Sequence, residues 1–150
     1  MSDTVVVMNA GRIEQTGSPR DIYDRPATRF VAQFVGEASV LACKATGADG
    51  NGQRLVLDDG QTLVTAERDL PAGALSAIIR PERLSLARPG LPTIRGTVTD
   101  STYLGDKIRI EAHLGGGRMV ALLDGQDQPP ETGAAVTFAY DPIHVRVVSS

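Results

Sequence analysis

Helical spacing of apolar residues occurs only near the start of the chain, and short strand-like runs make up most of the remainder. Residues 4–8 and 12–15 are two such runs, and Asn9-Ala10-Gly11 separates them. This arrangement predicts a β hairpin, because glycine at position 11 tolerates the positive φ angle of a tight turn. The chain is therefore expected to open with two short antiparallel strands.

A first short helix is predicted directly after the hairpin. Ser18 can accept an N-cap hydrogen bond, Pro19 suits the first helical position, and the acidic Asp21 complements the exposed N–H groups. Pro26 is expected to end this helix within two turns.

A second helix is predicted from Thr28 to Val35, with Gly36 placed to terminate it. Four apolar residues share one face of this helix: Phe30, Val31, Phe34 and Val35. We expect this face to pack in the protein core rather than to bind a cofactor.

The pattern changes near residues 36–39 to short runs separated by Gly, Asp and Pro, which indicates an organisational boundary. The candidate strands are 39–46, 53–58, 61–66, 74–80, 93–103, 107–114, 117–123, 134–140 and 143–148. Asp59-Gly60 and Gly115-Gly116 are typical of hairpin turns. Apolar residues alternate with polar ones in the run Ile108, Ile110, Ala112 and Leu114, which predicts a strand with one buried face. The fold class is mainly β, and an OB-like barrel is preferred over a sandwich.

Composition and charge exclude several classes of protein. The 150 residues carry a formal net charge of −3, and the thirteen Arg and two Lys are dispersed, so nucleic acid is a poor partner. Cys43 is the only cysteine, and its neighbours favour a small core residue. The apolar runs are much shorter than the ~20 residues of a membrane helix, and no signal-peptide pattern opens the chain. A cytoplasmic location is expected.

The usual catalytic patterns are not found in the sequence. A phosphate-binding loop needs spaced glycines followed by Lys and Ser or Thr, and Gly105-Asp106-Lys107 lacks both the earlier glycine and a favourable charge. His113 and His144 lie on separate predicted strands without metal-ligand spacing. We therefore expect no catalytic residues and no metal site.

Residues 5–36 closely resemble the end of the nucleotide-binding domain of ABC importer ATPases. Three motifs carry the resemblance: Gly-Arg-Ile-Glu-Gln-x-Gly, Pro-x-x-Ile-Tyr-x-x-Pro and Phe-Val-Ala-x-Phe-Val-Gly. The downstream runs Ile79-Arg80-Pro81-Glu82, Tyr103-Leu104-Gly105 and Pro142-Ile143-His144-Val145 are similar to landmarks of the TOBE domain, the OB-like barrel of that family. The resemblance implies two parts, residues 1–36 from the nucleotide-binding domain and residues 37–150 as the TOBE domain.

The resemblance implies a regulatory and dimerisation module of an importer ATP-binding subunit, with polyamines or a related small solute as the transported class. Walker A, signature, Walker B and switch-histidine motifs lie upstream in that family, so this chain is expected to bind no cofactor, whereas the parent would use ATP and magnesium. The expected partners are a second copy, a second ATPase subunit and transmembrane permease subunits, at the cytoplasmic side of the inner membrane. The hairpin, residues 4–16, is expected to find a partner chain in concentrated solution, since an orphaned hairpin exposes its strand edges.

The candidate interface or structural residues form two groups. Arg80, Pro81 and Glu82 are predicted to make a rigid corner that leaves Arg80 and Glu82 free to pair within or between subunits, with a purely intramolecular structural turn as the alternative. The second group is a strand end and bend, with an interface element as the alternative: Tyr103, Leu104 and Gly105.

An alternative function is a small-oxyanion-binding barrel like those of molybdate or sulfate importers. Ser101 and Thr102 would offer hydroxyl groups to the anion in that case.

Overall fold

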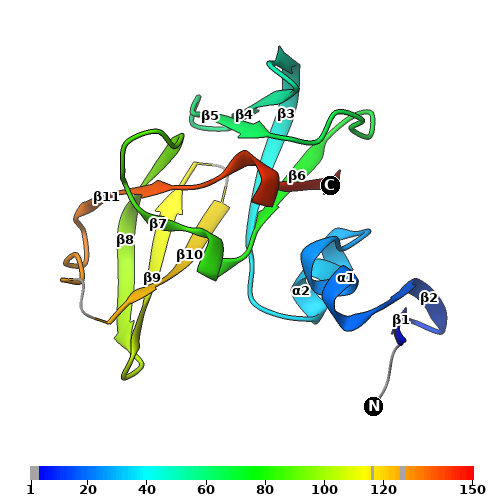
Figure 1. Cartoon of the computed structure of the whole chain (residues 1–150), viewed down its shortest axis with the longest axis horizontal. Helices are drawn as coiled ribbons and strands as arrows, with labels where there is room; N and C mark the ends of the chain where they lie inside the picture. The colour runs from blue at the N-terminus through cyan, green and yellow to red at the C-terminus, as the bar shows by residue number, and fades with distance from the viewer. Residues whose placement is uncertain (1–3, 116, 126–127) are drawn as a thin grey trace.

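The computed structural model describes residues 4–115, 117–125 and 128–150. It contains two β sheets of unequal size (Figure 1). Strands β1 (Val5–Asn9) and β2 (Arg12–Gly17) form a two-stranded antiparallel sheet. Helices α1 (Pro19–Asp24) and α2 (Arg29–Phe34) lie between this hairpin and the large sheet (Figure 1). We call residues 4–36 the N-terminal unit.

The N-terminal unit has the elements that its sequence predicts. Ala10 and Gly11 form the hairpin turn with φ angles of 51° and 80°. The Ser18 hydroxyl accepts a hydrogen bond from the Asp21 N–H, and the Thr28 hydroxyl accepts one from the Val31 N–H. Both helices therefore begin at side-chain caps.

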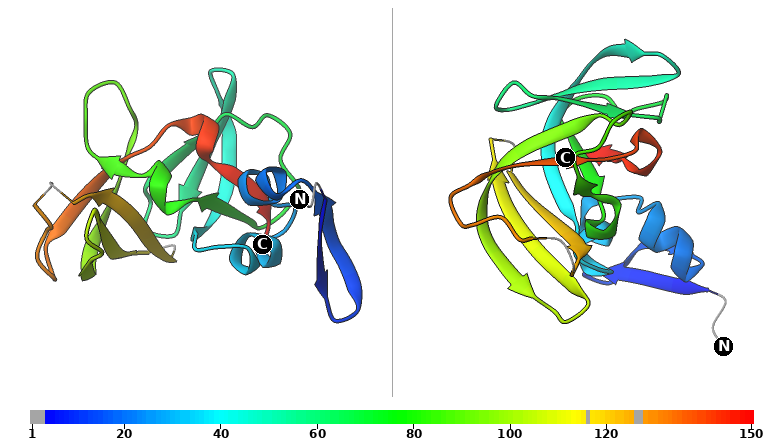
Figure 2. Two further views of the ribbon diagram at one scale, coloured as in Figure 1. Left: turned by 60° about the horizontal axis from the view of Figure 1, so that its bottom comes forward. Right: turned by 60° about the vertical axis from the view of Figure 1, so that its left-hand side comes forward.

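The remaining strands form one antiparallel sheet of ten strands that curls into a half-barrel (Figure 2), which we call the barrel. The strands are β3 (Ser39–Asp49), β4 (Gly52–Leu57), β5 (Thr62–Thr65), β6 (Leu75–Ile79), β7 (Ser85–Leu86), β8 (Thr93–Tyr103), β9 (Lys107–Leu114), β10 (Gly117–Asp124), β11 (Ala135–Ala139) and β12 (Arg146–Ser149). Their order is β12-β6-β3-β10-β9-β8-β11-β7, and β4 pairs with both β3 and β5. The predicted mainly β, OB-like fold is confirmed.

Some strand boundaries differ from those predicted. The expected strand 143–148 begins later, because Pro142 opens the 3₁₀ turn η2 (Pro142–His144) and the Asp141 side chain caps it. A second 3₁₀ turn, η1 (Pro81–Arg83), precedes the short strand β7, which the pattern did not predict. The expected Gly115-Gly116 turn lies partly outside the described residues.

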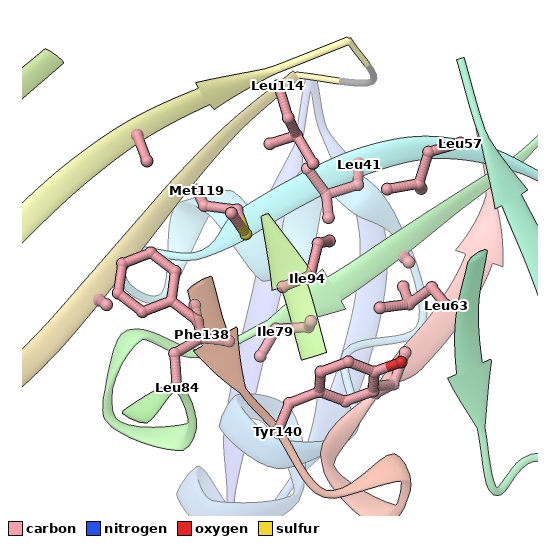
Figure 3. Packing of buried hydrophobic residues seen from close by; sticks show 14 of the residues in the cluster. Leu41, Leu57, Leu63, Ile79, Leu84, Ile94, Leu114, Met119, Phe138 and Tyr140 are labelled. Atoms are coloured by element: carbon pink, nitrogen blue, oxygen red, sulfur yellow. The ribbon is translucent and has the colours of Figure 1, made fainter. Parts of the chain in front are cut away.

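The main hydrophobic core fills the concave side of the barrel (Figure 3). The alternation predicted for β9 is confirmed, since its four apolar side chains are buried: Ile108, Ile110, Ala112 and Leu114. Cys43 is also buried in this core, as its neighbours predicted. Phe138 and Tyr140 of the β11 region are among its largest side chains, and the Tyr140 hydroxyl accepts a 2.9 Å hydrogen bond from the Val64 N–H. This bond satisfies the polar end of a buried ring.

The N-terminal unit has a much smaller core, built around Val7, Ile22 and Val31. A third cluster joins α2 to the barrel, where Ala32 packs against Ile78 and Val148. The expectation that the whole apolar face of the second helix is buried is wrong for Phe34, whose exposed fraction is 64%. Its ring stacks on Phe30, with centroids 5.6 Å apart, and the rest of its surface is largely exposed.

Candidate functional site at the junction of the N-terminal unit and the barrel

Arg80 connects the barrel to both helices of the N-terminal unit. It follows β6 in an extended conformation with φ −73° and ψ 146°, as expected for a residue before proline, and its exposed fraction is 5%. Its guanidinium donates hydrogen bonds to four backbone carbonyl oxygens: those of Tyr23 (3.1 and 2.9 Å), Ala32 (2.8 Å), Gly36 (3.2 Å) and Glu37 (3.2 Å). One side chain therefore binds the carboxyl-terminal parts of both helices and the segment that leads to β3.

Tyr23 provides the second contact at this junction. The Arg80 guanidinium carbon lies 4.2 Å from the centroid of the Tyr23 ring, a distance typical of a cation–π contact. The Tyr23 hydroxyl donates to the two carboxylate oxygens of Glu82 at 3.0 and 2.7 Å. Burial and then the Glu82 carboxylate raise the pKa of Tyr23 to about 12, so the hydroxyl keeps the proton that it donates.

Gly36 allows the chain to pass close to this stack. A Cβ atom at position 36 would lie 3.1 Å from Cε1 of Tyr23 and 3.8 Å from Nη1 of Arg80. A side chain here would push the tyrosine ring away from the guanidinium. The glycine that sequence analysis assigned to helix termination also makes room for the contact. We call Tyr23, Gly36, Arg80 and Glu82 the Arg80 junction.

Arg109 of β9 makes a separate ionic contact with the segment after α2. Its Nε and Nη2 donate hydrogen bonds to the two carboxylate oxygens of Glu37, at 2.8 and 2.6 Å. Glu111 accepts from Arg109 at 3.2 Å and from Arg118 at 2.9 Å, which extends the network along β9 and β10. Hydrogen bonding from Arg109 lowers the pKa of Glu37 below its ordinary value.

Arg146 of β12 makes a third connection. Its Nε donates to the Pro26 carbonyl oxygen at 3.0 Å, and its Nη1 lies 3.1 Å from the Glu67 carboxylate. Three arginines from three different barrel strands or strand ends therefore hold residues 23–37. Such an arrangement restrains how the N-terminal unit can rotate on the barrel.

The structure uses the two predicted groups of residues differently. Pro81 opens η1, while Arg80 and Glu82 are both engaged within the chain, which fits the intramolecular reading of this corner. The second group lies at the turn between β8 and β9: Tyr103 and Leu104 have exposed fractions of 68% and 51%, and Gly105 has a φ of 91°. The structure does not unite the two groups in one site.

Sequence reasoning missed Tyr23, Glu37, Arg109 and Arg146 as junction residues. The Ile-Tyr-x-x-Pro motif did mark Tyr23, but nothing in the sequence indicated that its ring meets position 80. In the sequence, Glu37, Arg109 and Arg146 are ordinary polar positions on strands or linkers, without a pattern that marks them.

The described residues contain neither a metal-binding cluster nor a membrane-spanning helix. No group of three or more His, Cys, Asp or Glu in them is arranged to hold a metal ion. None of their helices combines the length and apolarity that crossing a membrane requires.

The barrel matches a known domain family. Residues 77–148 match the family model described as "TOBE domain", so the barrel contains a TOBE domain. The solved structure of the molybdate-binding protein ModG, with molybdate bound, superposes with a TM-score of 0.59 over 75% of this chain and 96% of that chain. At 12% identity this similarity shows the fold alone.

Curated relatives extend the similarity to most of the chain. An Fe(3+) ions import ATP-binding protein of Brucella abortus (strain 2308) is 36% identical over 140 residues, which cover 92% of this chain and 39% of that protein. A spermidine/putrescine import ATP-binding protein of Ruegeria pomeroyi is 35% identical over 132 residues, covering 88% of this chain and 36% of that protein. The resemblance to ABC importer ATP-binding subunits is therefore confirmed over most of the chain, which spans about two fifths of the length of these relatives.

Proposed function

We propose that this chain is the regulatory and dimerisation module of the ATP-binding subunit of a bacterial ABC importer. One observation carries the proposal: Arg80 belongs to the TOBE domain, and its guanidinium donates hydrogen bonds to four carbonyl oxygens of residues 23–37. Residues 1–36 are assigned to the nucleotide-binding domain and residues 37–150 to the TOBE domain.

The contacts of the junction suit the transmission of movement. Hydrogen bonds from a charged donor are stronger than neutral ones, and a carbonyl left buried without its donor is costly. The two helices therefore cannot shift far without moving the end of β6 or breaking this set of bonds. A conformational change of the nucleotide-binding domain would reach the barrel through Arg80, and the reverse coupling would have the same size.

The rest of the assembly follows from the relatives. Their names include import of ferric iron and of spermidine and putrescine, which supports a transported solute from a class that includes these small cations. In the parent, ATP and magnesium would bind outside this chain. Permease subunits and a second ATP-binding subunit would be its partners at the cytoplasmic face of the membrane.

A chimeric transporter tests this coupling. The matching segment of the Brucella abortus relative is replaced by this chain, either wild type or Arg80→Met, and solute-stimulated ATP hydrolysis of the assembled importer is measured. The wild-type chimera should keep the stimulation, and Arg80→Met should lose most of it. Arg20→Met is the matched control, because its ion pair with Asp24 is exposed. Equal stimulation of all three chimeras would overturn the coupling role.

Dimerisation is tested on the chain itself by light scattering. Tyr103 and Leu104 present exposed apolar surface on the barrel, and β1–β2 leaves its outer strand edges unpaired within the described residues. Concentration-dependent self-association is expected, accompanied by slower hydrogen exchange in residues 4–16. A strict monomer at high micromolar concentration would remove the dimerisation part of the proposal.

Oxyanion binding by the barrel is the second candidate, supported by the fold shared with ModG. The hydroxyls that it would use are engaged: Ser101 donates to the Pro130 carbonyl oxygen at 3.2 Å and Thr102 to the Asp100 carboxylate at 3.3 Å. A neighbouring carboxylate repels an anion, so the geometry favours this candidate less. Calorimetric titration with molybdate, tungstate and sulfate decides it, and no heat from any of them would exclude it.

A further inference from the structure

A cleft opens beside the Arg80 junction, at the carboxyl end of α1. Its volume is about 280 Å³, and its lining residues come from α1, the end of β6 and the two 3₁₀ turns: Asp24, Arg25, Arg80, Arg83, Ile143 and His144. An adjoining cavity of about 360 Å³ shares four of these residues. Sites for drug-sized ligands usually measure roughly 300 Å³ or more, so a cleft just below that size suits a smaller ligand. We call it the junction cleft.

Three cationic or titratable side chains of the junction cleft have no acidic partner. Arg80 is bound to carbonyl oxygens, and Arg146 of the adjoining cavity pairs with Glu67. By contrast, the side chains of Arg25, Arg83 and His144 form no ion pair or hydrogen bond with any other residue that the structure describes. They come from three separate elements and line one cavity.

The charge balance of the cleft favours an anion. Asp24 is the one carboxylate among the lining residues, and its Oδ2 lies 3.5 Å from Nε of Arg20, which offsets part of its charge. The other polar residues that line the cleft are three arginines, Arg25, Arg80 and Arg83, and His144. Arginine is the side chain best shaped for oxyanions, because its planar fork can donate two parallel hydrogen bonds to one phosphate or carboxylate group.

We propose that the junction cleft binds a small phosphate-type oxyanion, held by Arg25, Arg83 and His144. Arg25 belongs to the N-terminal unit, whereas Arg83 and His144 belong to the barrel, so the bound anion bridges the same two parts that Arg80 joins. By linkage, a ligand that binds only the assembled junction stabilises it. The inference concerns binding by this chain alone and holds whether or not the module regulates a transporter.

Nuclear magnetic resonance titration of the full chain with inorganic phosphate tests the proposal, with sodium chloride at matched ionic strength as the reference titration. Saturable shifts are expected for the amides of residues 24, 25, 83 and 144 and for the His144 ring. Loss of a charge-assisted hydrogen bond predicts that Arg83→Gln weakens phosphate binding by about tenfold or more.

Arg12→Gln is the matched control, since Arg12 is an exposed arginine at the start of β2. It should bind phosphate like the wild type. Shifts that do not saturate, that chloride reproduces, or that Arg12→Gln reduces as much as Arg83→Gln would show charge screening only and overturn the site. Failure of the chimeric transporter test would leave this result unaffected, so the two proposals can fail separately.

Discussion

The barrel and the N-terminal unit are held together by different kinds of interaction. The barrel buries a continuous apolar core beneath its curled sheet, including Phe138, Tyr140 and Leu41. The N-terminal unit buries only Val7, Ile22 and Val31 fully in its own cluster, and leaves Phe34 largely exposed. Hydrophobic stabilisation scales with the apolar area that is buried, so the barrel can supply its own stability and the small unit cannot.

The difference shows where the stability of the N-terminal unit comes from. Its helices are six residues long, far shorter than isolated helices that persist in water. Besides the contact of Ala32 with Ile78 and Val148, polar bonds from Arg80 and Arg146 hold it on the barrel, and Arg109 binds Glu37 directly after it. The unit should therefore detach while the barrel stays folded.

The largest effect is expected from Phe138→Ala in the barrel core. Removing a fully buried phenylalanine leaves a cavity and should lower the free energy of unfolding by about 3–5 kcal/mol. Chemical denaturation followed by circular dichroism measures it. Phe34→Ala is the control, and a change of about 1 kcal/mol or less is expected because that ring is exposed. Equal losses at the two positions would mean that the barrel is not the stable part.

Arg80→Met should come next, and its effect should be confined to the N-terminal unit. The substitution leaves four carbonyl oxygens without their donor, at a cost of about 2–3 kcal/mol for the docked unit. Hydrogen exchange should become faster in residues 19–36 and stay unchanged in β9 and β10. The control Arg20→Met should leave exchange near wild type, because its ion pair is exposed. Faster exchange across the whole barrel would contradict independent detachment.

A smaller, pH-dependent effect is expected at the contact between Glu37 and Arg109. Hydrogen bonds from Arg109 lower the pKa of Glu37 below its ordinary value of 4.5. The contact therefore stabilises the protein above that pH and is lost as the pH falls through the lower folded value. The Glu37 side chain is 41% exposed, so the contribution is about 1 kcal/mol or less.

Comparison of wild type with Glu37→Gln at several pH values measures this contribution. The difference in free energy of unfolding should be largest near neutral pH and should close in acid. A difference that stays constant down to strongly acidic pH would show that charge on Glu37 is not its source.

The smallest effect on folding is expected from Tyr103→Ser at the β8–β9 turn. Its side chain is exposed, so the free energy of unfolding should change by about 0.5 kcal/mol or less. If this turn lies in a dimer interface, the same substitution weakens self-association measured by light scattering. Ile143→Ser is the matched control, because Ile143 is equally exposed at 68%. Unchanged association in Tyr103→Ser, or an equal loss in the control, would remove the turn from the interface.

Local patterns in the sequence predicted most of the elements. Caps at Ser18 and Thr28 and the glycine at position 11 act within a few residues, so they can be read directly. The alternation along β9 also needs no knowledge of its neighbours. The strand expected at 143–148 failed at its start because Pro142 and Asp141 favoured a 3₁₀ turn over extension.

By itself, the sequence determined that this protein has a short helical opening, a mainly β body and motifs shared with importer ATP-binding subunits. Only the tertiary structure decided that Arg80 reaches Tyr23, that Arg109 meets Glu37, and that Arg25, Arg83 and His144 face one cleft. Backbone conformation depends on neighbouring residues, whereas the partners in these contacts lie 57 to 119 positions apart in the sequence and meet only where the N-terminal segment packs on the barrel. Contacts of that kind carry no local pattern from which they could be read.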